Sequence, residues 1–208
     1  KVIIKNMCGI LGVVSPYKSE ISLNSLQNSM HSRGPDDFKV FNGNFNDKII
    51  EMYFSRLSII DLNQRSAQPF EKYNKILIFN GEIYNFLEIK KKLSSKYKFH
   101  TKSDTEVLLT AYEEWGLDCV KYLEGMWAFA IYDKQKNKII LSRDRFGEKP
   151  LYILKQSDGI FFGSETKFIE TLSDNWQKPN LNKCSSFLNY GYNSVFHDNE
   201  TFKKNIKI

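Results

Sequence analysis

Met7-Cys8-Gly9-Ile10-Leu11-Gly12-Val13-Val14 places a cysteine immediately before an apolar run that predicts a β-strand. If residues 1–7 are removed, Cys8 becomes the first residue and carries a thiol and a free α-amine together. Both groups titrate close to neutral pH, so the amine can take the proton of the thiol without a histidine. While Met7 remains attached, the nitrogen of Cys8 is an amide without basicity. The segment therefore predicts a nucleophile only if the chain begins at Cys8.

The composition indicates one folded domain. With 208 residues, of which 41% are hydrophobic, the chain is long enough for one substantial core. The net charge of +6 is spread over scattered lysines, so we expect no nucleic-acid partner. Three cysteines, an odd number, favour reduced thiols in the cytoplasm, and we expect Cys119 and Cys184 to be inert. No apolar run approaches the ~20 residues that span a bilayer, so no membrane partner is expected.

Hydrophobic patterning predicts about eight strands, separated by turn-forming residues and interspersed with helices. The expected strands are 10–14, 38–41, 49–60, 75–79, 126–132, 138–142, 151–154 and 160–162, and the expected helices are 21–30, 83–93, 104–115 and 164–172. Ser103-Asp104-Thr105-Glu106 is typical of a capping box, and Gly116 is expected to end that helix. Beyond Ser173 the regular pattern is expected to end. These elements predict an α+β fold of packed antiparallel sheets with helices outside.

Taken singly, the polar candidates allow two interpretations each. Arg56 could form a surface ion pair or clamp a carboxylate through its guanidinium fork. Asn80-Gly81 could be a turn, or an oxyanion hole built from a side-chain amide and a backbone N–H. Asp104 could simply cap a helix. The three histidines lack a partner motif for a Cys/His dyad, and no spacing resembles a metal site or a phosphate-binding loop.

Several motifs occur along the chain in one order and together narrow these alternatives. They are Cys8-Gly9-Ile10, His31-Ser32-Arg33-Gly34-Pro35-Asp36-Asp37, Arg56-Leu57-Ser58-Ile59-Ile60-Asp61, Asn80-Gly81-Glu82-Ile83-Tyr84-Asn85 and Ser103-Asp104-Thr105-Glu106, followed by further strings at 124–133, 143–152 and 162–167. The combination resembles class II glutamine amidotransferase domains, and within them the glutaminase half of glutamine-hydrolysing asparagine synthetase. The strings RLSIID, NGEIYN and DRFGEKPLY favour this branch over relatives that act on sugar phosphates or phosphoribosyl substrates.

The resemblance implies the N-terminal-nucleophile fold, a four-layer α/β/β/α sandwich of two antiparallel sheets. It also implies that Cys8 attacks the side-chain amide of L-glutamine, with its own α-amine relaying the proton to the leaving ammonia. The side-chain amide of Asn80 and the N–H of Gly81 would then stabilise the tetrahedral oxyanion. A γ-glutamyl thioester would form, and water would hydrolyse it to glutamate.

The same resemblance implies how the substrate is held. Arg56 would bind the α-carboxylate of glutamine, and Glu82 and Asp104 would receive its α-ammonium. The pocket would also be lined by Leu57, Ser58, Ile59 and Ile60. The segment Arg33-Gly34-Pro35-Asp36 resembles a loop that closes over the bound glutamine, although it could also be a plain tight turn.

Residues 1–7 are expected to be a leader or a non-native extension, 8–190 the glutaminase domain and 191–208 a linker toward an absent C-terminal synthetase domain. That partner domain would use ATP and Mg²⁺, whereas the glutaminase domain would need no cofactor or metal. A homodimer is compatible with the resemblance. Two alternatives stay open: a non-catalytic scaffold domain of the same fold, if Lys1–Met7 are retained, and a self-processing hydrolase with another amide substrate. The leader could be lost by translation from Met7 with removal of that methionine, or by self-cleavage.

Overall fold

The computed structural model describes residues 8–56, 67–191 and 199–208. Its strands are β1 Gly9–Ser15, β2 Asp37–Phe45, β3 Lys48–Arg56, β4 Phe70–Lys72, β5 Lys75–Ile83, β6 Gly125–Asp133, β7 Lys138–Arg143, β8 Tyr152–Gln156, β9 Gly159–Gly163 and β10 Ile206–Lys207. Its helices are α1 Leu23–Met30, α2 Phe86–Leu93, α3 Asp104–Trp115, α4 Thr166–Leu172 and α5 Leu181–Tyr190, with a 3-10 helix at Gly116–Lys121.

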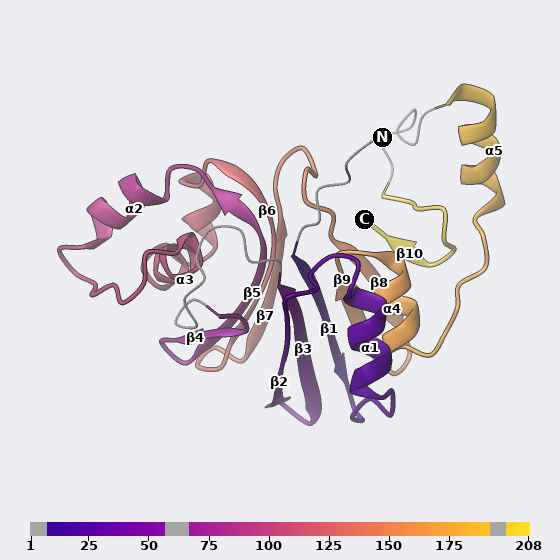
Figure 1. Ribbon diagram of the computed structural model, residues 1–208, viewed down its shortest axis with the longest axis horizontal. Helices are drawn as coiled ribbons and strands as arrows, with labels where there is room; N and C mark the ends of the chain where they lie inside the picture. Colours follow the sequence, from indigo (N-terminus) through magenta and orange to yellow (C-terminus); the bar gives the residue numbers. More distant parts are fainter. Residues whose placement is uncertain (1–7, 57–66, 192–198) are drawn as a thin grey trace.

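The strands form two antiparallel sheets that face each other (Figure 1). Sheet A has the order β10-β8-β9-β1-β3-β2, and sheet B has the order β4-β5-β6-β7. Helices α1 and α4 cover the outer side of sheet A, and α2 and α3 cover the outer side of sheet B (Figure 1). Three apolar cores fill the spaces between these layers. The predicted α+β fold with four α/β/β/α layers is therefore confirmed.

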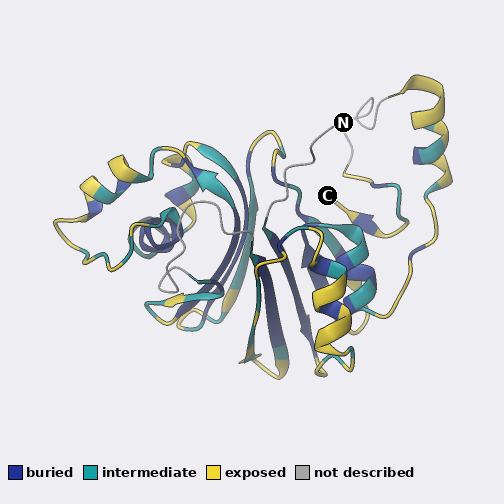
Figure 2. Cartoon of the chain, in the orientation of Figure 1, coloured by how far each residue is buried: buried dark blue, intermediate teal, exposed yellow. Residues whose placement is uncertain are grey.

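Burial follows this layering. Figure 2 shows the strands of both sheets largely buried, while α1, α2 and α5 each carry an exposed side. Among the described residues, no helix is long and apolar enough to cross a bilayer.

Strand alternation decides which side chains face the space between the two sheets. Ile10 of β1 and Ile78 of β5 belong to the core between the sheets, whereas Leu11 belongs to the core under α1 and α4. Successive strand side chains point to opposite faces, so even-numbered positions of β1 and β5 face inward between the sheets. Cys8 packs against this same middle core, and Asn80 shares the face of Ile78.

Two expectations about β5 and its surroundings were wrong. β5 runs through Asn80 and Gly81 to Ile83, so this pair lies inside a strand and forms no turn. The following helix consequently begins at Phe86 rather than at Ile83. Nine register pairs with β6 hold the longer strand, and this tertiary pairing overrides the local turn preference of Asn-Gly.

The expectation that regular structure ends at Ser173 was also wrong. Helix α5 spans Leu181–Tyr190, and Ile206–Lys207 of the expected linker form β10 beside β8. Ile206 is 1% exposed and belongs to the core under α1 and α4. The polar, Asn-rich composition concealed α5, whose N-cap is the Asn180 side chain accepting from the Lys183 N–H. The short strand β4 was missed as well, since a strand of three residues carries little pattern.

Candidate active site

Cys8 lies at the entry to β1, one residue beyond the ladder that joins β1 to β3. In that ladder Gly9 is paired with Ser55, so continuing the register brings Cys8 opposite Arg56. Arg56 ends β3 and shares the inward face of Phe54, which belongs to the core between the sheets. The ladder therefore brings the predicted nucleophile and the predicted carboxylate clamp to the same end of sheet A.

The loop that follows α1 fixes the backbone of Cys8. Arg33 Nε donates to the Cys8 carbonyl oxygen at 3.3 Å, and its Nη1 lies 3.5 Å from a Glu165 carboxylate oxygen. Gly34 sits directly on β3, because a Cβ added there would lie 2.4 Å from the carbonyl carbon of Ser55. Sequence reasoning interpreted this segment as a closing loop, and the structure shows it packed against the end of β3 and the carbonyl of Cys8.

Asn80 and Gly81 come from the opposing sheet. Asn80 is 2% exposed, and its side chain shares the inward face of β5 with Ile78. Gly81 is required by close packing, since an added Cβ would lie 2.2 Å from the Met126 carbonyl oxygen of β6 and 2.7 Å from Cε2 of the Phe79 ring. Strands β1 and β5 contact each other across the space between the sheets. The predicted oxyanion pair therefore faces the sheet that carries Cys8.

Three buried polar atoms mark this region. Within the described part of the chain, the buried side-chain atoms without a hydrogen-bond partner are Arg33 Nη2, Ser55 Oγ and Asn80 Nδ2. Arg33 binds the carbonyl of Cys8, and Ser55 is the register partner of Gly9. Buried polar groups are almost always paired, so the unpaired Asn80 amide on the inward face of β5 indicates a place where a polar ligand completes the bonding. Ser55 instead faces the core under α1 and α4, beside Gly9 and Phe168.

Asp104 begins α3 and reaches the far end of β5. Its Oδ2 accepts the Ile83 N–H at 3.1 Å. Burial raises the pKa of the Asp104 carboxyl, the hydrogen bonds from the Ile83 and Thr105 N–H groups act against that rise, and negative charge on Glu82 adds to it. Glu82, two residues after Asn80 in β5, and Asp104, at the start of α3, thus form a pair of acidic groups. Such a pair suits an ammonium group, which would relieve their mutual repulsion.

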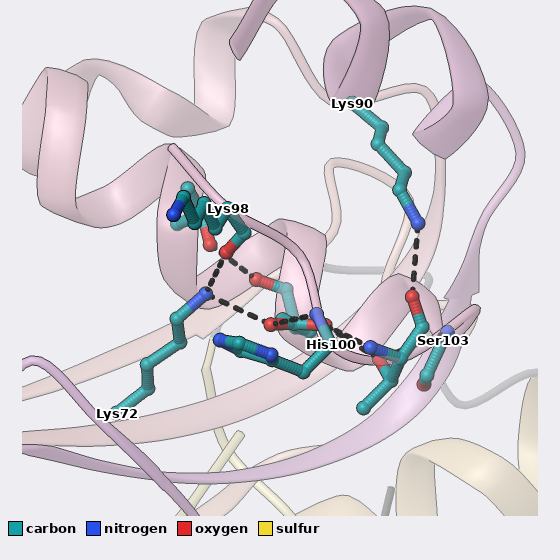
Figure 3. Close-up of polar contacts among 8 residues, drawn as sticks. Lys72, Lys90, Lys98, His100 and Ser103 are labelled. Atoms are coloured by element: carbon teal, nitrogen blue, oxygen red, sulfur yellow. Dashed lines mark hydrogen bonds and ion pairs between the residues drawn. The ribbon is translucent and has the colours of Figure 1, made fainter. Parts of the chain in front are cut away.

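A buried carboxylate holds the segment that leads to Asp104, as Figure 3 shows. Glu106 is 1% exposed and accepts the N–H groups of His100 and Thr101 at 3.0 and 2.6 Å. Burial acts to raise the pKa of Glu106, but the Lys72 ammonium and these N–H donors hold it below its ordinary value. Glu106 therefore does not complete a capping box with Ser103; its carboxylate fixes the preceding loop instead. The Ser103 cap itself is confirmed, because its side chain accepts the Thr105 N–H at 3.1 Å.

Two lysines tie the same loop to the rest of sheet B and α2. Lys72 Nζ donates to Glu106 Oε1 at 2.8 Å and to the Lys98 carbonyl at 2.7 Å. Lys90 Nζ donates to the Thr101 carbonyl at 2.9 Å (Figure 3). The start of α3, and with it Asp104, is consequently anchored from both sides.

Lys149 is a buried group at this site to which sequence reasoning assigned no role. It is 6% exposed. Burial lowers the pKa of its ammonium. Electrostatic interactions with Glu82 and Cys8 act to raise that pKa, and the interaction with Arg33 acts to lower it. The string DRFGEKPLY contained it, but nothing in the spacing indicated that this lysine turns inward.

Asp144 holds the loop that carries Lys149. Its carboxylate accepts the backbone N–H groups of Trp127, Phe146, Glu148 and Lys149 at 3.0 to 3.2 Å. Burial acts to raise the pKa of Asp144, and the four N–H donors outweigh it, so the pKa lies below its ordinary value. Trp127 is the register partner of Gly81, so the same carboxylate also fixes the strand opposite the oxyanion pair.

The structure thus places Cys8 and Arg56 together at one end of sheet A, and Asn80, Gly81 and Glu82 near the end of β5 in sheet B, with Asp104 bonded to that end. The predicted pocket residues Leu57, Ser58, Ile59 and Ile60 lie outside the described residues, as do residues 1–7. No group of three or more His, Cys, Asp or Glu residues in the described ranges could hold a metal ion. Of the other two cysteines, Cys119 is buried and burial raises the pKa of its thiol to about 12.

The sequence and the fold of this chain are similar to those of known proteins. A family model described as a glutamine amidotransferase domain matches residues 7–208. A relative from Methanocaldococcus jannaschii is 35% identical over 220 residues, which cover 97% of this chain and 42% of the relative. Another, from Bacillus subtilis, is 38% identical over 170 residues, covering 77% of this chain and 26% of its own. The names of both include glutamine-hydrolysing asparagine synthetase.

A solved structure of glutamine phosphoribosylpyrophosphate amidotransferase from Bacillus subtilis, complexed with ADP and GMP, has a TM-score of 0.62 and 19% identity. The match covers 80% of this chain and 44% of that protein, and at this identity the likeness shows the fold alone. The chain spans less than half the length of each of these three proteins.

Proposed function

The chain belongs to the glutamine amidotransferase domain family, and from that premise we propose that it hydrolyses L-glutamine to glutamate and ammonia with Cys8 as the nucleophile. The observation that carries the proposal is the buried Asn80 Nδ2 without a hydrogen-bond partner, on the face of β5 that is turned toward the sheet carrying Cys8. An amide carbonyl that becomes a tetrahedral oxyanion would supply the missing acceptor at the moment when its charge is largest.

The proposed reaction has two halves. The Sγ atom of Cys8 attacks the δ-carbon of glutamine while its proton passes to the α-amine of Cys8. The tetrahedral intermediate collapses as the same amine returns the proton to the leaving nitrogen, releasing ammonia and leaving a γ-glutamyl thioester. Water then attacks the thioester, and the amine passes a proton from that water to Sγ. This sequence requires a free α-amine, so it requires that residues 1–7 be removed.

Each remaining group has a proposed task during this sequence. Asn80 Nδ2 and the Gly81 N–H receive the oxyanion, and the Arg33 guanidinium keeps the Cys8 backbone in place through its carbonyl oxygen. Arg56 binds the α-carboxylate, and Asp104 with Glu82 binds the α-ammonium. The two oppositely charged clamps fix an amino acid of one length, which favours glutamine over a simple amide.

Ammonia released here is proposed to pass to a C-terminal ATP-dependent synthetase domain, which would amidate aspartate or a related carboxylate. The support for this step is the naming of the relatives, whose lengths leave room for a further domain. ATP and Mg²⁺ belong to that second domain in this proposal. A homodimer is likewise a proposal only.

The experiment that tests the proposal is a glutaminase assay on the protein as the cell makes it, together with its N-terminal sequence. We expect Cys8 as the first residue and Cys8-dependent release of glutamate. Cys8→Ala should abolish that release, and Cys184→Ala is the matched control because Cys184 is also partly exposed but lies on α5. A Cys8→Ala protein that still releases glutamate at the parent rate would overturn the proposal.

A further inference from the structure

The edge of β5 beside the oxyanion pair lacks a continuous strand neighbour. β4 pairs only with residues Lys75–Leu77 of β5, and among the described residues no strand continues on this side (Figure 1). In an antiparallel sheet, the N–H and C=O of one residue point to the same neighbour, and those of the next residue point to the other. Phe79, Gly81 and Ile83 therefore all direct their backbone groups toward this edge.

Two side chains take the place of the missing strand. Gln68 Oε1 accepts the Phe79 N–H at 2.5 Å, and Gln68 Nε2 donates to the Phe79 carbonyl at 3.1 Å. Four residues further along, Asp104 Oδ2 accepts the Ile83 N–H. The Gly81 N–H lies between these two anchored positions, on the same edge.

The Gln68 side chain lies where the backbone of a continued β4 would be. In the β4–β5 register Phe70 is opposite Leu77, so position 68 would be opposite Phe79. Position 69 would be opposite Ile78, whose backbone groups point toward β6, so Pro69 takes no bond away from this edge. The carboxamide of Gln68 has one donor and one acceptor with the geometry of a peptide group, so it can stand in for the backbone of a strand. It is 8% exposed, which makes both bonds difficult for water to replace.

The position of the Phe79 backbone affects the positions of both oxyanion donors. It precedes Asn80 in the strand, and its ring edge lies 2.7 Å from where a Cβ of Gly81 would be. A shift of the Phe79 backbone would therefore move the Asn80 side chain and the Gly81 N–H together.

We propose that Gln68 is a positioning residue for the oxyanion hole: its carboxamide replaces a strand beside Phe79 and so aims Asn80 Nδ2 and the Gly81 N–H at the reacting carbonyl. The inference rests on the proposed glutaminase function and adds to it a group that touches no substrate. It assigns to Gln68 an effect on the chemical step, and none on the binding of the α-carboxylate and α-ammonium.

The variant Gln68→Glu tests this assignment with almost no change in shape. When ionised, the new carboxylate still accepts the Phe79 N–H but repels the Phe79 carbonyl oxygen. Displacing catalytic groups by about 1 Å costs roughly 100-fold, so we expect kcat for glutamine hydrolysis to fall roughly 10- to 100-fold. Lowering the pH protonates the new carboxyl, whose O–H can again donate to Phe79. The ratio of variant to parent kcat should therefore recover on the acid side.

Two inhibitors distinguish a displaced oxyanion hole from a general loss of substrate binding. L-2-Aminobutyrate has no polar γ-group and uses only the clamps for the two α-substituents, whereas L-glutamate γ-semialdehyde adds to Cys8 and places a tetrahedral oxygen in the oxyanion hole. Gln68→Glu should weaken binding of the semialdehyde by the same factor as kcat and leave the inhibition constant of L-2-aminobutyrate unchanged.

The matched control is Gln177→Glu. Gln177 is also 8% exposed and also uses its carboxamide in two hydrogen bonds, to the Asn175 carbonyl and from Asn205 Nδ2, away from the site. Its variant should lose stability to a similar degree and keep the parent kcat.

The outcomes separate this inference from the function on which it rests. A parent without Cys8-dependent glutaminase activity overturns both. An active parent whose Gln68→Glu variant keeps the parent kcat and semialdehyde affinity overturns the role of Gln68 alone. If Gln68→Glu yields no folded protein, amide exchange in the parent decides: the Phe79 amide should exchange slowly, and the Gly81 amide should become slow only when the semialdehyde is bound. Rapid exchange at Phe79, or no change at Gly81, overturns the inference.

Discussion

Sheet A brings Cys8 and Arg56 to the end of a regular ladder, with β1 flanked by β3 and β9. Sheet B presents Asn80 and Gly81 beyond the pairing of β5 with β4, where, among the described residues, the side chains of Gln68 and Asp104 bond this edge of β5. The nucleophile therefore directly precedes a strand that is paired on both sides, whereas the oxyanion donors lie on a strand that is paired with β6 on one side and bonded by side chains on the other. Substitutions in sheet B should consequently separate chemistry from binding more cleanly than substitutions in sheet A, where the same ladder fixes both.

The largest effect that tests this contrast is expected at Asn80. Asn80→Ala removes one oxyanion donor, which costs about 100- to 1,000-fold in kcat, while the clamps and hence KM for glutamine stay nearly unchanged. Asn85→Ala is a suitable control, because Asn85 bonds the Tyr122 carbonyl and the Glu124 N–H outside the site. Steady-state kinetics with glutamine measure both constants. A large rise in KM with an unchanged kcat would assign Asn80 to substrate binding instead.

A smaller effect, confined to binding, is expected at Arg56. Arg56→Lys keeps the charge but loses the guanidinium fork, so the bidentate contact with the α-carboxylate is lost. Hydrogen bonds to charged groups contribute about 1.5–3 kcal/mol, so kcat/KM should fall roughly 10- to 100-fold, mainly through KM. Inhibition by L-glutamate should weaken in parallel. An unchanged glutamate inhibition constant would show that Arg56 does not hold the α-carboxylate.

The pH dependence of kcat/KM should report the protonation of Asp104, which bonds the end of β5 and is proposed to bind the α-ammonium. Burial raises the pKa of Asp104, and its ionised form is the one that binds an ammonium. As the pH falls through that raised pKa, the carboxylate takes up a proton and kcat/KM for glutamine should decline, at a higher pH than for an ordinary aspartate. Asp104→Asn should lower kcat/KM and remove this acid limb. A limb that persists unchanged in the variant would belong to another group.

The smallest effect is expected at Glu106, which supports Asp104 only through the loop before α3. Glu106→Gln removes the charge that faces Lys72 and weakens the bonds to His100 and Thr101, at a cost of roughly 1–3 kcal/mol in the free energy of unfolding. Denaturant unfolding measures this loss. KM for glutamine should rise by less than in Asp104→Asn, and kcat should not change. A fall in kcat as large as that of Asn80→Ala would place Glu106 in the chemistry itself.

The fold and most of the elements that carry the candidate site residues could be predicted from the sequence, because these elements rest on local signals. The strand after Cys8, the cap at Ser103 and the two strands β6 and β7 are confirmed, since each is fixed by residues close together in the chain. Asn80-Gly81 was ambiguous because its turn preference is local, whereas its strand conformation comes from pairing with β6, more than forty residues away.

The supporting residues could not be predicted in the same way. Gln68, Lys149 and Asp144 act through tertiary contacts: a carboxamide that stands in for a strand, a lysine turned inward, and a carboxylate that gathers four N–H groups. The positions of these residues in the sequence do not predict such roles. Only the distances in the folded chain reveal it.

The most direct test of the central claim is the intact mass of the natural protein, measured before and after rapid acid quenching during glutamine turnover. The account predicts a chain that begins at Cys8 and a quenched population carrying one γ-glutamyl group on Cys8, located by peptide mapping. The adduct should be absent when Cys8 is replaced by alanine. A mature, active protein that retains residues 1–7, or one whose glutamyl group maps to another residue, would contradict the account.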